Sequence, residues 1–381
     1  MRPIHRFLTG ARSAFAALGA SLLLGACAQG GGELGYYWQS VSGHVQLMWA
    51  ADAMDDWIAR PDTPPALRER LRMGQRARTF AVQELHLPDN PSYRRYADVK
   101  RGSAVWNVVA APPYSLQLHT WCFPVLGCVG YRGYFSQTDA RAEADLLAAQ
   151  GLEVDVYGVP AYSTLGTLNW LGGDPLLSTF VHWPEGDFVR LLFHELAHQK
   201  VYAEGDTLFN ESFATAVGRI GSAEWLRTQA SAAARSEAAA SDARREGFRQ
   251  LTRETRAQLE QIYAPNGAPA QEGQALEAMK TEAIQRFRER YAALAATWPA
   301  AQRAGYDHWV ATANNASFGA QAAYDEWVPA FETLFEQSAR NWPQFYDAVK
   351  ALAQQNADQR HAALRALIAP STPAAKEPPR V

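Results

Sequence analysis

The spacing of apolar residues changes along the chain, and this change predicts a mixture of helices and strands. Residues 34–58 and 66–87 repeat apolar side chains at helical spacing, and Pro61, Pro64 and Pro65 separate the two segments. A further helix is expected at 138–150. Short apolar runs bounded by proline and glycine predict strands at residues 105–109, 115–119, 131–135, 154–157 and 162–168.

From Asp187 onward the apolar pattern is almost entirely helical. A first helix would be capped by Asp187 and end near Ala203, and a second would end near Gly221. More helices would follow as far as Ile368, with an interruption at 265–267.

These patterns predict an α+β fold that is mostly α. A small antiparallel β region would lie next to a helix pair, and a large helical C-terminal half would follow. The expected divisions are an export signal at 1–26, a flexible tether at 27–33, a first folded region with N-terminal helices at 34–221, a helical region at 222–369 and a disordered tail at 370–381.

The N-terminal segment indicates export. Arg2, Arg6 and Arg12 precede an apolar run at about 13–24, which suits a signal peptide and is too short to span a bilayer. The run ends in Leu-Gly-Ala-Cys27, which resembles the bacterial lipobox, where the cysteine carries lipid. The chain is therefore expected at the cell envelope, facing the periplasm and attached to a membrane through Cys27; a plain signal peptide with a nearby cysteine is the alternative.

Net charge and cysteine content indicate which binding partners and which cysteine pairing to expect. Loss of residues 1–26 would remove three arginines and no acid, so the net charge would change from −3 to −6. No basic patch stands out, which argues against nucleic acid as a partner. Cys122 and Cys128 remain as a pair in an oxidising compartment, where a disulfide is expected; a second metal site with His119 is the less favoured alternative.

His194, Glu195 and His198 form the pattern His-Glu-x-x-His in an apolar helical run. Residues i and i+4 share one face of a helix, so both imidazoles can reach one metal ion. Glu195 lies about 100° further around the helix, where a carboxylate can take a proton from a metal-bound water. The alternative is a core helix whose histidines hydrogen-bond to backbone or carboxylate groups.

Glu211 offers a third ligand and leaves a fourth position open for water, as a catalytic zinc site requires. Twelve residues separate it from His198, enough for a short turn between antiparallel helices. Asp206 is expected either to hydrogen-bond a ligating imidazole or to cap the second helix.

The two elements resemble the gluzincin metallopeptidases, which include thermolysin and aminopeptidase N. Their His-Glu-x-x-His and Asn-Glu-x-x-Ala patterns correspond here to residues 194–198 and 210–214. The gap between the elements is shorter than in that group, and Gly218 stands where enzymes similar to aminopeptidase N carry another glutamate.

More of the chain resembles a family of bacterial exported proteins described as putative aminopeptidases. This resemblance rests on the Cys122–Cys128 loop, on residues 131–135, 161–166 and 314–316, and on the metal motif. It implies a zinc peptidase that acts on peptide substrates.

The expected chemistry assigns Glu195 as general base and zinc as Lewis acid. Tyr162, Tyr202 and Tyr324 are candidates to donate a hydrogen bond to the oxyanion, although packing alone also explains each of them. The strand expected around Tyr162 could bind an extended peptide. Three acids are open candidates for recognising a free amino terminus: Glu185, Asp187 and Glu204.

Two other functions are consistent with the sequence. One is an endopeptidase or amidase that acts on envelope peptides. The other is a non-catalytic lipid-anchored envelope protein with a vestigial metal site, but a purely structural site has no use for Glu195 as a base. Oligomeric state and substrate sequence do not follow from the sequence.

Overall fold

The structure is a computed structural model that describes residues 33–123, 127–167, 169–264 and 273–368. Contacts divide the chain into two units, residues 1–47 and 48–381. The described part of the first unit is a helix, α2 (Glu33–Trp49), whose last two residues belong to the second unit. Residues 222–368 belong to the same compact unit as the candidate metal helices.

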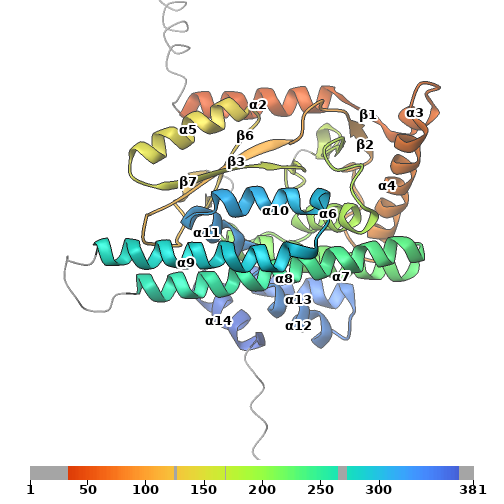
Figure 1. Ribbon diagram of the computed structural model, residues 1–381. Coiled ribbons are helices and arrows are strands. Elements are labelled where there is room, and N and C mark those ends of the chain that lie inside the picture. Colours follow the sequence, from red (N-terminus) through yellow and green to blue (C-terminus); the bar gives the residue numbers. More distant parts are fainter. Residues whose placement is uncertain (1–32, 124–126, 168, 265–272, 369–381) are drawn as a thin grey trace, which may run out of the picture. The chain divides into compact units, whose positions relative to one another are not determined.

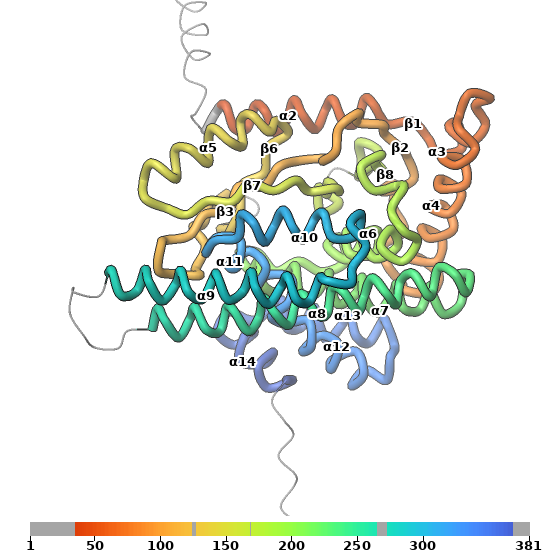
Figure 2. The backbone as a smooth tube through the Cα atoms, viewed as in Figure 1, coloured from red at the N-terminus to blue at the C-terminus, as the bar shows by residue number. Residues whose placement is uncertain are grey.

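The second unit is mostly helical and carries small sheets, which confirms the expected α+β class (Figures 1 and 2). Its first half contains β1 (Ala51–Ala53), α3 (Met54–Ala59), α4 (Pro65–Gln83), β2 (Arg95–Ala97), β3 (Val105–Ala111), β4 (Trp121–Phe123), β5 (Gly127–Val129), β6 (Arg132–Tyr134), α5 (Gln137–Ala149), β7 (Glu153–Val159), the 3₁₀ turn η2 (Asn169–Leu171) and β8 (Leu176–Leu177).

The second half is helical, as expected. It contains α6 (Glu185–His198), α7 (Thr207–Thr228), α8 (Ala232–Tyr263), α9 (Gly273–Leu294), the 3₁₀ turn η4 (Ala295–Thr297), α10 (Ala300–Thr312), α11 (Asn315–Ala323), α12 (Val328–Gln337), α13 (Trp342–Ala353) and α14 (Ala357–Ile368). The long helices α8 and α9 lie side by side (Figure 2).

The sheet that matters most for the site has the order β6-β3-β7, with antiparallel pairs throughout. Alternate side chains of a strand point to opposite faces. One face of β3 presents Val109 and Ala111 to Ala316 of α11, in a cluster that Tyr131 and Tyr157 join. Helix α5 also packs on β3 and β7 (Figure 1).

Two smaller sheets complete the β structure. In the first, β2 pairs antiparallel with β1 and parallel with β8, so the β structure is not wholly antiparallel. The second is the hairpin β4–β5, whose register places Cys122 opposite Cys128. These two cysteines form the expected disulfide.

Two expected strands are absent from the described residues. Residues 115–119 follow a proline pair and form no strand. Leu116 instead packs into an apolar cluster of the helical half, and Leu118 packs into the cluster between β3 and α11. Residues 162–164 have no regular structure and residues 165–167 form a turn, with positive φ at Leu165 and Gly166. The first helix also ends at Trp49, earlier than Ile58, because Ala51–Ala53 pairs as a strand.

No helix in the part of the chain that the structure describes is long and apolar enough to cross a bilayer.

Candidate metal centre

Helix α6 begins and ends differently from the sequence prediction. It starts at Glu185 after Pro184, with Asp187 in its first turn and not at the cap, and it ends at His198 and not near Ala203. Acids in the first turn favour the start of a helix through its dipole. Apolar residues on the inner face, including Leu192 and Leu196, are almost fully buried.

Helix α7 runs antiparallel to α6 and is longer than expected, ending at Thr228 and not near Gly221. Asp206 is its N-cap and accepts a hydrogen bond from the Phe209 amide at 3.0 Å. Asn210 closes the turn, because its side chain donates to the Ala203 carbonyl and accepts from the Ala203 amide, both at 2.7 Å. This turn sets Glu211 back beside His198.

The side chains of His194, His198 and Glu211 converge. The two imidazole Nε2 atoms lie 3.1 Å apart, and Glu211 Oε2 lies 3.3 Å from His194 Nε2 and 3.6 Å from His198 Nε2. Within the described ranges, this is the only group of at least three histidine, cysteine or acidic side chains that lie close enough together to hold a metal ion. His119 therefore takes no part in such a group there.

The donor set fits zinc. Ligand atoms about 2.0–2.1 Å from a tetrahedral zinc ion would lie roughly 3.3 Å from one another, close to the three separations found here. The Glu211 and His194 side chains are 12% and 13% exposed, so the cluster remains in contact with solvent. Three protein ligands with an open side are typical of a catalytic site.

The charges at the site are strongly coupled. Burial would raise the pKa of Glu211, but the charges and hydrogen bonds of His198 and His194 hold that pKa well below its usual value. Burial of His198 lowers its pKa, and Glu211 outweighs this effect, so the pKa is raised overall. Burial raises the pKa of Glu195, which sits beside the cluster without joining it.

Tyrosines surround the carboxylates, and several of them were not foreseen. Burial and then the charge of Glu211 raise the pKa values of Tyr131, Tyr202 and Tyr324. Tyr157 is close to Glu211 as well, and its hydroxyl shares a hydrogen bond with Tyr324. Tyr157 comes from β7, and Tyr131 comes from the short link between β5 and β6. The spacing of residues around the metal motif does not reveal either position.

Of the three tyrosines proposed from sequence, Tyr324 has the clearest contact with the cluster. Its ring lies 6.3 Å from that of His194, with the two planes inclined by 25°. Tyr202 is electrostatically close to Glu211 and Glu204. Tyr162 contacts Phe135 and lies outside any strand, so the expected strand for peptide binding is not formed around it.

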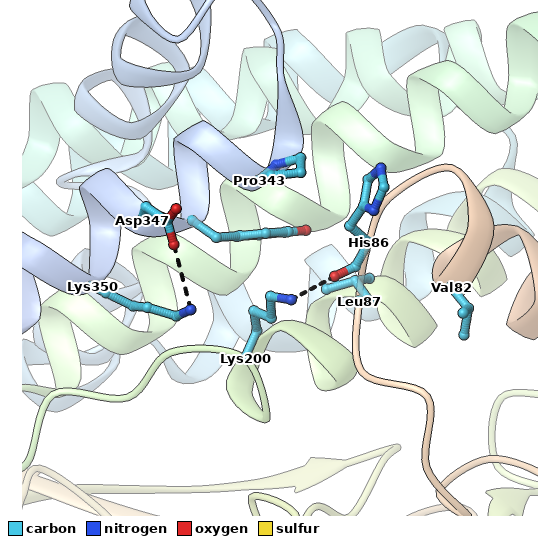
Figure 3. Close-up of a pocket in the computed structure, with 8 residues that line it drawn as sticks. Val82, His86, Leu87, Lys200, Pro343, Asp347 and Lys350 are labelled. Carbon is cyan, nitrogen blue, oxygen red and sulfur yellow. Dashed lines mark hydrogen bonds and ion pairs between the residues drawn. The ribbon is translucent and has the colours of Figure 1, made fainter.

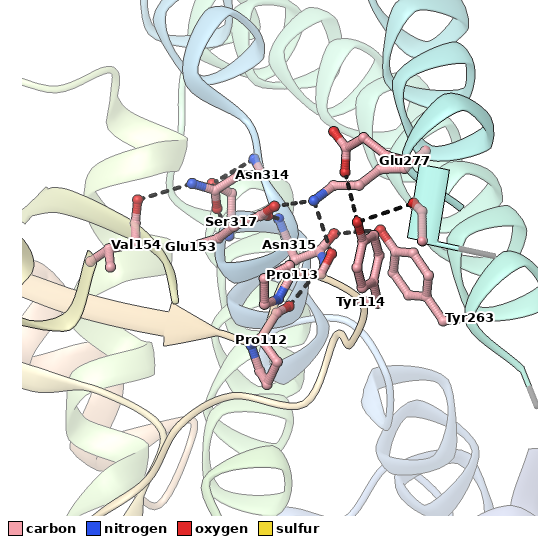
Figure 4. A network of polar contacts seen from close by, with 12 residues as sticks. Pro112, Pro113, Tyr114, Glu153, Val154, Tyr263, Glu277, Asn314, Asn315 and Ser317 are labelled. Atoms are coloured by element: carbon pink, nitrogen blue, oxygen red, sulfur yellow. Dashed lines mark hydrogen bonds and ion pairs between the residues drawn. The ribbon is translucent and has the colours of Figure 1, made fainter. Parts of the chain in front are cut away.

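Two networks place Tyr324. Ser212, next to Glu211, donates to the Ala323 carbonyl at 3.0 Å and accepts from the Trp327 amide at 3.1 Å, so α7 holds both sides of Tyr324. At the other end of α11, Asn315 accepts from Tyr263 and donates to the Pro112 and Pro113 carbonyls (Figure 4). These contacts show that the Asn314–Ala316 motif holds the start of α11 in place.

Two roles were expected for Asp206, a hydrogen bond to a ligating imidazole or the N-cap of the second helix, and the structure shows the N-cap. Its carboxylate also contacts Arg360 at 2.5 Å and His361 at 2.8 Å, both from α14. His198 Nδ1, the imidazole atom expected to contact Asp206 in the other role, has no hydrogen-bond partner in the described residues. The C-terminal helix therefore supports the start of α7, one turn before Glu211.

The three acids considered for amine recognition lie elsewhere or are engaged. Glu185 accepts from Trp225 Nε1 at 2.7 Å, and Asp187 pairs with Arg245 at 2.7 Å, both at the far end of α6. Glu204 lies in the turn between α6 and α7, close to Gly127 of the disulfide hairpin. None of them is brought beside Glu195.

A buried carboxylate that was not foreseen, Asp174, does lie close to Glu195. Asp174 is 1% exposed, and burial and then the charge of Glu195 raise its pKa to about 6. It lies between η2 and β8. No motif marks this residue, because its partners come from distant parts of the chain.

A separate cavity of about 280 Å³ lies beyond the C-terminal end of α6 (Figure 3). Lys200 donates to the His86 carbonyl at 2.7 Å and lies over the Tyr346 ring, and Lys350 pairs with Asp347 at 3.6 Å. Both ammonium groups are thus engaged by the protein itself.

Fold and site together define a mostly helical α+β protein with a candidate metal centre on a helix pair. Residues 35–364 match the model of the family described as "Putative aminopeptidase", so the chain belongs to that family, and membership points to a peptidase. The resemblance seen in the sequence is confirmed at the level of the family. No curated protein matches the chain, and no solved structure matches it.

Proposed function

We propose that this protein is a zinc-dependent metallopeptidase of gluzincin type that acts as an aminopeptidase on peptides. The observation that carries the proposal is the convergence of His194, His198 and Glu211, with Glu195 beside them. Family membership supports the reaction class, and the donor set supports the choice of zinc.

The chain's own residues supply the remaining chemistry. A zinc ion held by His194, His198 and Glu211 would supply Lewis acidity toward the scissile carbonyl and lower the pKa of water. Glu195 accepts a proton from the attacking water and gives it to the leaving amine nitrogen. Burial suits Glu195 to this task, because the raised pKa brings proton uptake closer to neutral pH.

Tyr324 is the proposed donor to the developing oxyanion. Its ring is beside His194, and its backbone is fixed by Ser212. Donors fixed in advance stabilise charge that develops in the transition state.

Two alternatives make different demands on the site. An endopeptidase or amidase would use the same cluster but cleave substrates whose amino terminus is blocked. A non-catalytic protein would not need Glu195 next to the ligands, and burying a carboxylate there without a task costs stability. The position of Glu195 therefore favours an enzyme.

We also propose that the protein is anchored by lipid at Cys27 and works at the bacterial cell envelope, facing the periplasm. The support is the lipobox-like sequence before Cys27 and the disulfide between Cys122 and Cys128, a bond typical of exported proteins. Cys27 lies outside the described residues.

The decisive experiment measures zinc content and hydrolysis together. The wild type should hold about one zinc per chain and cleave peptides with a free amino terminus faster than N-blocked ones. Glu195→Gln should keep zinc and lose hydrolysis, since an amide cannot accept the proton. Glu211→Ala should lose zinc and activity together, because two histidines remain.

Glu336→Gln is a suitable control, because that carboxylate is 60% exposed on α12. It should change neither quantity. Loss of zinc from Glu195→Gln, or full zinc and activity in Glu211→Ala, would show that these roles are wrongly assigned. Equal cleavage of blocked and free peptides would favour the endopeptidase alternative.

A further inference from the structure

A buried polar cluster joins three segments at the C-terminal end of α6. Its centre is Asp174, whose carboxylate accepts from the Thr164 amide at 3.0 Å and from Gln199 Nε2 at 3.3 Å. The Asp174 amide in turn donates to Ser92 Oγ at 3.0 Å. The segment at 162–167, the loop before β2 and the end of α6 are thereby tied to Asp174.

Gln199 is the C-cap of α6 and follows His198 directly. Besides Asp174, its side-chain amide donates to Ser92 Oγ at 3.2 Å, and its carbonyl accepts from Asn90 Nδ2 at 2.7 Å. Both ends of the Gln199 side chain are therefore fixed, which is more restraint than a helix cap alone requires.

The helix geometry connects this cluster to the proposed base. Glu195 and Gln199 are four residues apart, so their side chains project from the same face of α6. Asp174 lies on that side, because its carboxylate accepts from Gln199 Nε2. His194 and His198 project about 100° away around the helix axis.

We propose that Asp174 is a positioning residue for Glu195, acting through Gln199. It fixes the rotation of the last turn of α6, and this rotation sets the Glu195 carboxylate against the ligand cluster. The proposal rests on the proposed role of Glu195 as base. Loss of a partner that orients a metal ligand typically changes activity by about 10–100-fold, and we expect an effect near the lower end for a residue that orients the base.

Steady-state kinetics of Asp174→Ala and Gln199→Ala test the proposal. Each should lower kcat about ten-fold, with zinc content unchanged and KM for the same peptide altered less than two-fold. The double variant should lose little more than either single variant, because both act on one contact. Asp174→Asn, which keeps an acceptor oxygen for the Thr164 amide, should recover part of the rate.

Asp187→Asn is the matched control at the opposite end of α6, where Asp187 pairs with Arg245. It perturbs the same helix and should leave kcat within two-fold of the wild type. Loss of zinc in parallel with loss of rate in the Asp174 variants would overturn the proposal in favour of general structural support. A KM increase limited to substrates with a free amine would overturn it too, because Asp174 would then contact substrate.

Hydrogen exchange of the metal-free protein separates this proposal from the function itself. Asp174→Ala should speed amide exchange at residues 197–200 while α7 stays protected. If the wild type binds no zinc and cleaves no peptide, the proposed function fails, yet this exchange result still shows whether Asp174 fixes the end of α6. Unchanged exchange in a folded variant would refute the positioning role.

Discussion

At the scale of single residues, side chains of the same type in the site have different pKa values because their surroundings differ. Glu195 and Glu211 are both buried carboxylates, but two histidines lower the pKa of Glu211 while burial raises that of Glu195. These opposite shifts suit the roles proposed for them, Glu211 as an ionised ligand and Glu195 as the group that carries a proton. Burial and the charge of Glu211 raise the pKa values of Tyr131, Tyr157 and Tyr324, and Tyr157 differs from the other two in having side-chain hydrogen bonds that lower its pKa.

Tyr324→Phe tests the oxyanion donor. Removal of one such hydroxyl should lower kcat about 100-fold and leave zinc content unchanged. Tyr346→Phe is the matched control: this buried hydroxyl donates to the Leu85 carbonyl at 2.8 Å, and its loss should cost about 1 kcal/mol of stability without changing kcat. A near-normal kcat in Tyr324→Phe would leave Tyr131 or Tyr202 to be tested.

At the scale of elements, the close approach of α6 and α7 depends on Gly218. A Cβ atom added there would lie 2.7 Å from the Arg190 carbonyl and 3.3 Å from His194 Cβ. A glutamate, as in enzymes similar to aminopeptidase N, would not fit without moving the helices apart. The short gap between the two motif elements and the glycine at 218 are therefore both consistent with a closely packed helix pair.

Gly218→Ala should lower the free energy of unfolding by about 1–3 kcal/mol through overpacking and weaken zinc binding as His194 is displaced. Gly305→Ala, on α10, should instead stabilise by about 0.5–1 kcal/mol, since nothing lies within 4 Å of the added Cβ. Urea unfolding and chelator competition measure the two effects. Unchanged zinc affinity in a destabilised Gly218→Ala would mean that the helix spacing does not control the ligands.

At the scale of the whole molecule, the C-terminal helices support a site that the middle of the chain supplies. Arg360 and His361 of α14 hold the cap of α7, and α11 carries Tyr324 to the cluster. Residues 222–368 are thus part of the site's framework and not a separate appendage. Attachment to a membrane would be added at the opposite end of the chain.

Cys27→Ala should release the protein from membranes while leaving its specific activity unchanged, because the metal centre lies far along the chain from this position. Fractionation after a high-salt wash is the measurement, and multiple acylation is expected to give the wild type stable attachment. A variant that still sediments with membranes would show that lipid at Cys27 is not the anchor.

Local spacing predicted the parts of the site that lie close together in sequence. The histidine pair, Glu195 and Glu211 depend on helical periodicity and one short turn, and the disulfide depends on six residues of separation. Asp174, Tyr131 and Tyr157 were missed because tertiary contacts bring them in. The strand expected at 162–168 does not form in the described part, residues 162–167, where Leu165 and Gly166 have positive φ and Asp174 takes the Thr164 amide.

All three proposed ligands fall between His194 and Glu211, within one helix hairpin whose turn Asn210 closes. Closing so short a loop costs little chain entropy, so this hairpin is among the first parts of the molecule able to form. Uptake of the proposed zinc ion would then not have to wait for the sheet or for α11. Zinc captured at that stage would be built into the protein as it folds, and its binding energy would stabilise the hairpin around which the later helices assemble.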